Sequence, residues 1–75
     1  MKYFKAYTQK DFNAEKFYIE NENEKDVIFF AETEDNAMKA VTEYIYKTSL
    51  YSEKETADWI ENNPIYLEET TLAEI

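Results

Sequence analysis

This chain must stabilise its fold with its own apolar side chains, because it contains neither cysteine nor histidine. Disulfides and typical zinc sites are thereby excluded. A chain of 75 residues forms one domain and buries only about 60% of the surface that its unfolded chain exposes. Seven tyrosines, five phenylalanines and one tryptophan compensate, since each ring can bury roughly 150–250 Å². We therefore expect a single domain over residues 1–75, with a loosely held tail over 69–75.

Four segments have the patterns of β-strands. Residues 2–8 alternate, with aromatic residues on both faces, and residues 16–21 place two apolar residues on one face. Residues 26–32 contain an unbroken apolar run, which predicts a strand covered on both faces, or nearly so. A last strand is predicted over residues 65–68, after the only proline of the chain.

The turns between these segments have to form without glycine, which is absent. Tight hairpin turns need a residue with positive φ, and asparagine is the remaining residue that adopts it readily. The polar run over residues 21–26 predicts a turn by its composition. Asn62 predicts a left-handed cap at the end of a helix.

Two helices are predicted before the last strand. Thr33 is a good N-cap residue, and apolar residues recur at helical spacing from there to about Leu50. Ser52, with Glu55 three positions later, matches a capping box. It predicts a second helix that ends at the Asn-Asn-Pro sequence. We expect this helix to place Trp59 in the core.

The element order β-β-β-α-α-β predicts an α+β fold, in which a small antiparallel sheet has two helices packed on one face. The other face of such a sheet is open to solvent. Tyrosines suit this open face, because their rings cover apolar surface while their hydroxyl groups stay hydrated.

The missing residue types exclude most catalytic and cofactor-binding motifs. Without histidine and cysteine there is no Ser-His-Asp triad and no Cys-His pair. Without glycine there is no phosphate-binding loop. Arginine is also absent, so the chain lacks a bidentate clamp for phosphate or carboxylate groups. We therefore expect no enzymatic activity, no cofactor and no metal.

Carboxylates alone can still support metal-dependent or glycosidase-like chemistry, and acidic clusters lie over residues 20–26 and 32–35. The first cluster alternates acidic residues with asparagine, but it lacks the central glycine and closing glutamate of an EF-hand calcium loop. A solvated turn is the simpler interpretation. A minimal carboxylate enzyme stays open as a third hypothesis, and it predicts binding of magnesium, manganese or calcium.

The charge and hydropathy of the chain predict its cellular location and the kind of partner that it binds. Residues 1–7 contain no apolar stretch of the kind found in signal peptides, and the longest apolar run, Val27 to Ala31, is too short to span a bilayer. A net charge of −9 disfavours direct binding to nucleic acid or to an anionic membrane. We expect a cytoplasmic protein whose partners present cationic surfaces.

The acidic excess is the feature that most directly predicts a function. Seventeen acidic residues stand against eight lysines. On the second predicted helix, Glu55, Asp58 and Glu61 recur at helical spacing and form an anionic stripe about 10 Å long. Carboxylates at this spacing can imitate the phosphates of nucleic acid. Including tyrosines as anchors, the candidate partner-binding residues are Glu53, Glu55, Asp58, Glu61, Glu34, Asp35, Tyr46, Tyr51 and Tyr66.

We therefore hypothesise a small acidic inhibitor that occludes the basic nucleic-acid-binding surface of an enzyme. Phage or mobile-element antagonists of host enzymes, of the anti-CRISPR or anti-restriction type, are the functional analogy. The alternative is a structural or assembly module, such as a homodimer joined through sheet edges or exposed aromatic residues. The charge also has a simpler interpretation, in which it only keeps a small protein soluble.

Overall fold

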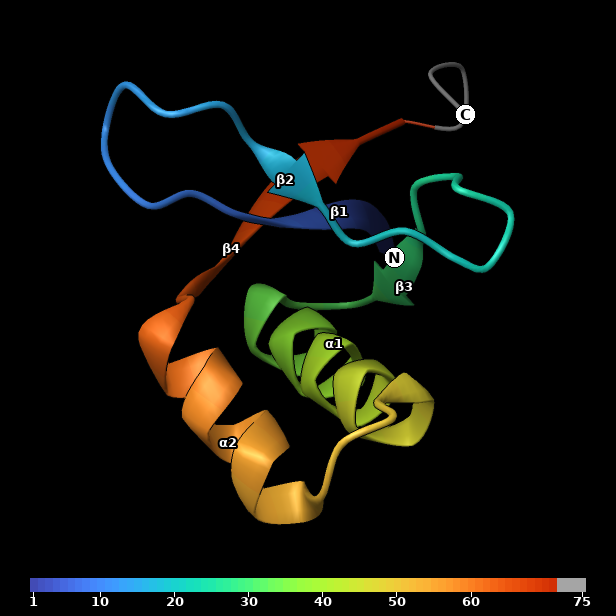
Figure 1. Ribbon diagram of the computed structural model, residues 1–75. Helices are drawn as coiled ribbons and strands as arrows, with labels where there is room; N and C mark the ends of the chain where they lie inside the picture. The colour runs from blue at the N-terminus through green and yellow to red at the C-terminus, as the bar shows by residue number, and fades with distance from the viewer. Residues whose placement is uncertain (72–75) are drawn as a thin grey trace.

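The computed structural model describes residues 1–71, which form a four-stranded antiparallel sheet and two helices (Figure 1). Both helices lie on the same side of the sheet. The predicted α+β class and the β-β-β-α-α-β order are therefore confirmed. In chain order, the elements are β1 (Lys2–Thr8), β2 (Phe17–Tyr18), β3 (Phe29–Ala31), α1 (Glu34–Thr48), α2 (Glu53–Asn62) and β4 (Ile65–Thr70).

The sheet is organised around β1, which pairs antiparallel with each of the other three strands. β4 pairs with residues 3–8 of β1, which is nearly its whole length. A strand has only two hydrogen-bonding edges, so β3 and β2 meet the opposite edge, at residues 2–4 and 7–8 of β1. β1 is thus the central strand, and its alternating side chains define the two faces of the sheet.

The hydrophobic core lies between one face of the sheet and α1. Phe4 and Val41 are the largest side chains that are fully buried, and the alanines around them let α1 approach the strands closely. The ring of Phe29 meets the ring of Tyr44 edge-on, with centroids 5.7 Å apart. The buried apolar residues are Phe4, Ala6, Phe29, Ala31, Ala37 and Val41.

β3 has one buried face and one exposed face. Phe29 and Ala31 are buried, whereas Phe30 between them is exposed. The prediction of a strand covered on both faces is wrong, because both helices lie on one side of the sheet. β2 and β3 are also shorter than predicted, because the chain that connects them turns away from the edge of β1.

Residues 20–26 form the turn that separates β2 from β3, closed by a bridge between Glu20 and Asp26. The side-chain oxygen of Asn21 accepts hydrogen bonds from the backbone N–H groups of Asn23 and Lys25, at 2.8 and 3.2 Å. Among the described residues, the one with positive φ is Glu24, at 62°. The prediction that asparagine supplies this conformation is wrong, because Asn21 stabilises the turn through its side chain instead.

Both helix starts confirm the predicted caps. The backbone N–H of Asn36 donates to Oγ1 of Thr33 at 3.2 Å. The backbone N–H of Glu55 donates to Oγ of Ser52 at 3.2 Å, and that hydroxyl donates to the Glu55 carboxylate at 3.3 Å. The start of α2 is therefore fixed by local hydrogen bonds.

The end of α2 differs from the prediction. Asn62 is still helical, and its side-chain amide donates to the Asp58 carbonyl at 2.9 Å. The cap is Asn63, with a φ of −130°, so the predicted left-handed cap at Asn62 is wrong. Pro64 follows directly and biases the residue before it toward extended backbone, which disfavours a left-handed cap here.

β4 continues beyond its predicted end. Glu69 and Thr70 belong to the strand, where they pair with Phe4 and Tyr3 of β1, and Thr70 is buried. These two residues were predicted to begin the loose tail, and for them that prediction is wrong. Residues 72–75 of the predicted tail lie outside the described residues.

Candidate functional site

α2 is attached to the rest of the molecule through its inner side. Thr56 is its buried residue, and Ile60 is partly buried one turn later. The Thr56 hydroxyl donates to the Ser52 carbonyl at 2.9 Å and lies 2.7 Å from the Ser49 hydroxyl. These contacts join the first turn of α2 to the end of α1 and orient the outer side of α2 toward solvent.

The carboxylates of α2 form an exposed anionic surface. Within residues 1–71 the ion pairs are Lys5 with Asp26, at 3.5 Å, and Lys16 with Glu68, at 3.6 Å. No carboxylate of α2 takes part in either, so their charge remains available to a partner. This surface, called the α2 acidic surface below, consists of Glu53, Glu55, Asp58 and Glu61.

Glu34 and Asp35 lie on the other helix, where both are exposed in the first turn of α1. The N-terminal end of a helix carries a partial positive charge, and an acidic residue there stabilises the helix by roughly 0.3–1 kcal/mol. Their position therefore gives both residues a structural role in α1, whether or not a partner binds.

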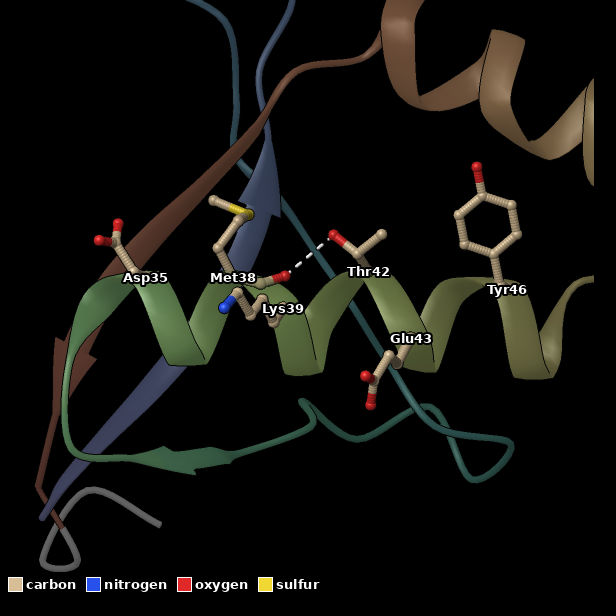
Figure 2. Close-up of a pocket in the computed structure, with 6 residues that line it drawn as sticks. All are labelled: Asp35, Met38, Lys39, Thr42, Glu43 and Tyr46. Carbon is tan, nitrogen blue, oxygen red and sulfur yellow. Dashed lines mark hydrogen bonds between the residues drawn. The ribbon is translucent and has the colours of Figure 1, made fainter.

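Tyr46 belongs to a stripe along the outer side of α1 (Figure 2). It lines an open hollow together with Asp35, Met38 and Thr42, so the structure brings two predicted partner-binding residues, Tyr46 and Asp35, onto one surface. The Thr42 hydroxyl donates to the Met38 carbonyl at 2.9 Å, as the dashed line in Figure 2 shows. That hydroxyl is thus already used within the helix.

Three large apolar side chains are exposed where α1 passes into α2. Leu50 is 98% exposed, Tyr51 is 72% exposed and Trp59 is 43% exposed. All three line a cleft of about 380 Å³, and they are called the α1–α2 corner below. The prediction that Trp59 is a core anchor is wrong, because the inner side of α2 is occupied by Thr56 and Ile60.

The open face of the sheet carries a cluster of aromatic rings. Tyr7 lies between Tyr18 and Tyr66, with both centroid distances 5.6 Å. Tyr3 and Phe30 stack at 4.8 Å farther along the sheet. Tyr66, which was predicted to anchor the same partner as the acidic stripe, packs against Tyr7 on the open face and also lines a hollow with Asn62 and Asn63 at the end of α2.

Charged side chains on this open face are paired with one another. The Tyr18 hydroxyl donates to Glu68 at 2.5 Å, and Lys16 pairs with the same carboxylate while lying 4.7 Å from the centroid of the Tyr7 ring. The hydrogen bond to Glu68, with burial and the nearby negative charge, raises the pKa of Tyr18 to about 12. The hydrogen bond from Tyr18 and the charge of Lys16 lower the pKa of Glu68.

Sequence reasoning missed two features of these surfaces. Leu50 was assigned to the end of the first helix, although α1 ends at Thr48 and leaves Leu50 in the connection. The contact between Tyr18 and Glu68 joins residues 50 positions apart, and no local pattern indicates it. The signal for Leu50 was available, because it falls outside the apolar face of α1.

Comparison with protein-family models, with curated proteins and with solved structures finds no match to this chain. Within residues 1–71, no group of three or more acidic side chains is placed to hold a metal ion. In the same part of the chain, neither helix has the length and apolar composition needed to cross a membrane.

Proposed function

We propose that the protein is a small inhibitor that binds other proteins, and that its α2 acidic surface occupies the basic nucleic-acid-binding surface of an enzyme. The observation that supports this proposal is the exposure of four α2 carboxylates, none of them in an ion pair within residues 1–71. The hydrogen bonds of Thr56 and the Ser52 cap hold these charges on a fixed scaffold.

The α2 acidic surface acts through electrostatic attraction to basic side chains of the partner. Glu55, Asp58 and Glu61 extend over about 10 Å of helix at 1.5 Å per residue, and such a row of charges competes with phosphates for lysine and arginine side chains. Long-range attraction speeds association, and salt screens it. The association rate with a basic partner should therefore fall as the ionic strength rises.

The α1–α2 corner supplies the apolar component that a stable interface needs. Protein interfaces combine an apolar centre containing aromatic residues with a polar rim, and tyrosine and tryptophan contribute much of the binding energy. Tyr51 is exposed just before α2, and Trp59 is exposed in its second half. Carboxylates and rings thus lie together on one end of the molecule.

The specific form of the proposal is a phage or mobile-element antagonist of a host nuclease or related enzyme, of the anti-CRISPR or anti-restriction type. Small size, a net charge of −9 and the lack of catalytic motifs support it. The mechanism requires no chemistry from this chain, because exclusion of the nucleic acid is sufficient to inhibit such an enzyme.

Charge reversal on α2 tests the proposal. The triple variant E55K/D58K/E61K should lose a bacterial nucleic-acid enzyme that the tagged wild-type protein captures from a lysate at low salt. The matched variant E15K/E24K/E69K has the same net charge, with all changes at exposed positions outside α2, and should retain the enzyme. Equal retention by both variants would contradict the proposal.

The aromatic open face favours a second candidate function, that of an assembly module. A second copy of the chain could cover the aromatic rings on this face, which belong to Tyr3, Tyr7, Tyr18, Phe30 and Tyr66. Two chains of charge −9 repel each other, so self-association should strengthen as salt rises. Light scattering across a salt series distinguishes this behaviour from partner binding through α2, which should weaken.

A further inference from the structure

A groove runs along one side of α1 and ends at the α1–α2 corner. It consists of two hollows, of about 380 and 580 Å³, which share Glu20, Tyr44 and Thr48 in their walls. One hollow reaches Trp59 of α2, and the other reaches Glu22 in the turn between β2 and β3. This continuous surface is called the α1 groove below.

The floor of the α1 groove is apolar. Ile19 and Ile45 are partly buried there against the core. The end of the groove at the α1–α2 corner is formed by Leu50, Tyr51 and Trp59, which the described part of the chain leaves exposed. Contiguous exposed apolar surface of this kind is typical of interaction sites.

One wall of the α1 groove is acidic. Glu20 and Glu22 line it, and both are exposed. No lysine is among the residues that line either hollow. The groove also reaches the C-terminal end of α1, where the partial negative charge of the helix favours cations.

We propose that the α1 groove binds a basic segment of a partner protein through large apolar side chains of that segment. The apolar floor accepts the apolar side chains, and lysine or arginine residues beside them meet the acidic wall formed by Glu20 and Glu22. Nucleic acid and a second copy of this chain both bring negative charge to this wall, so the wall selects against them. This inference rests on the proposed function and identifies the kind of partner segment that the protein recognises.

The position of Trp59 allows binding in the groove to be followed by fluorescence. It is the only tryptophan of the chain, so its fluorescence reports contact in the groove without a label. The probe is a short acetylated peptide of leucine and lysine at helical spacing, with no aromatic residue. We expect a blue shift of the Trp59 emission and saturable binding. A leucine–glutamate peptide and an all-lysine peptide should each bind at least about tenfold more weakly.

Variants locate the binding site of the peptide. L50S/Y51S should weaken peptide binding about tenfold or more, and E20K/E22K should weaken it by removing the acidic wall. Both pairs are solvent-accessible, so the core is unchanged. The matched control is F12S, because Phe12 is 96% exposed but lies outside the groove. It should bind as the wild type does.

Several results would overturn the inference. One is that L50S/Y51S binds the leucine–lysine peptide as tightly as the wild type does, and another is that the all-lysine peptide binds as tightly as the leucine–lysine peptide. A shift of the Trp59 emission caused by single-stranded DNA, or one that depends on protein concentration alone, would also overturn it. The variant D58K/E61K separates this inference from the proposed function, since neither residue lines the groove. If it retains both the peptide and the enzyme captured from a lysate, the inhibitor proposal fails and the groove stands.

Discussion

At the scale of single residues, Tyr18 and Glu68 link two strands that do not pair. Tyr18 is in β2 and Glu68 is in β4, on opposite edges of β1. Their hydrogen bond crosses the open face above Tyr7, whose ring contacts both Tyr18 and Lys16. Because β2 has only two residues, this contact adds side-chain support where backbone pairing is short.

The raised pKa of Tyr18 predicts how stability depends on pH. Its folded pKa of about 12 exceeds its ordinary value of 10.0, so its contribution is complete below pH 10.0 and is lost as the pH rises toward 12. The stability difference between the wild type and Tyr18→Phe, measured by urea unfolding, should therefore shrink across this range. Tyr51→Phe, at an exposed tyrosine, is the control. A constant difference for Tyr18→Phe would contradict the role of this hydrogen bond.

The lowered pKa of Glu68 gives the opposite dependence at acidic pH. Its contribution is complete above its ordinary value of 4.5 and is lost as the pH falls through the lower folded pKa. The contact between Tyr18 and Glu68 therefore stabilises the sheet across neutral pH.

At the scale of elements, α1 and α2 are held in different ways. α1 buries Ala37 and Val41 against the sheet, so its stability comes from the core. α2 buries Thr56 alone and presents Trp59 to solvent. α2 therefore depends more on its own hydrogen bonds, among which the Ser52 cap is prominent.

The cap of α2 can be tested directly. Ser52→Ala removes the acceptor for the Glu55 N–H and should destabilise the protein by about 1 kcal/mol, measured by urea unfolding. Ser52→Asp keeps an acceptor at the cap and should stay close to the wild type. If alanine and aspartate had the same effect, the cap would not contribute to the stability of α2.

At the scale of the whole molecule, one small core supports several exposed surfaces. Within residues 1–71, the core consists of six buried apolar residues centred on Phe4 and Val41. It fills the space between α1 and the sheet, while the aromatic open face, the α2 acidic surface and the α1 groove remain in contact with solvent. Such a domain has a stability of only about 5–15 kcal/mol, so single core changes have large effects.

Substitution of two phenylalanines tests whether the core is centred on Phe4. Phe4→Ala should cost about 3–5 kcal/mol because it leaves a cavity in the core. Phe12→Ala should change stability by less than about 0.5 kcal/mol, since Phe12 is exposed. Thermal unfolding followed by circular dichroism measures both. Similar losses for the two variants would show that the core is not centred on Phe4.

Local patterns in the sequence were sufficient for the class of fold and for the helix starts. The periodicity of residues 2–8 and the caps at Thr33 and Ser52 depend on neighbours in the chain, and all three are confirmed. The nine predicted partner-binding residues remain a prediction. The sequence placed Glu55, Asp58 and Glu61 on the second helix, but it could not place Tyr66 on the open sheet face, because that position depends on the register of β4 against β1.

The sequence by itself determined the acidic character, the absence of most catalytic motifs and the order of the elements, since these follow from composition and local spacing. Only the tertiary structure decided that Trp59 is exposed, that Phe30 and Tyr66 lie across the sheet from the helices, and that Tyr18 meets Glu68. The physical reason is that burial and long-range contact depend on which face of each element the rest of the chain covers.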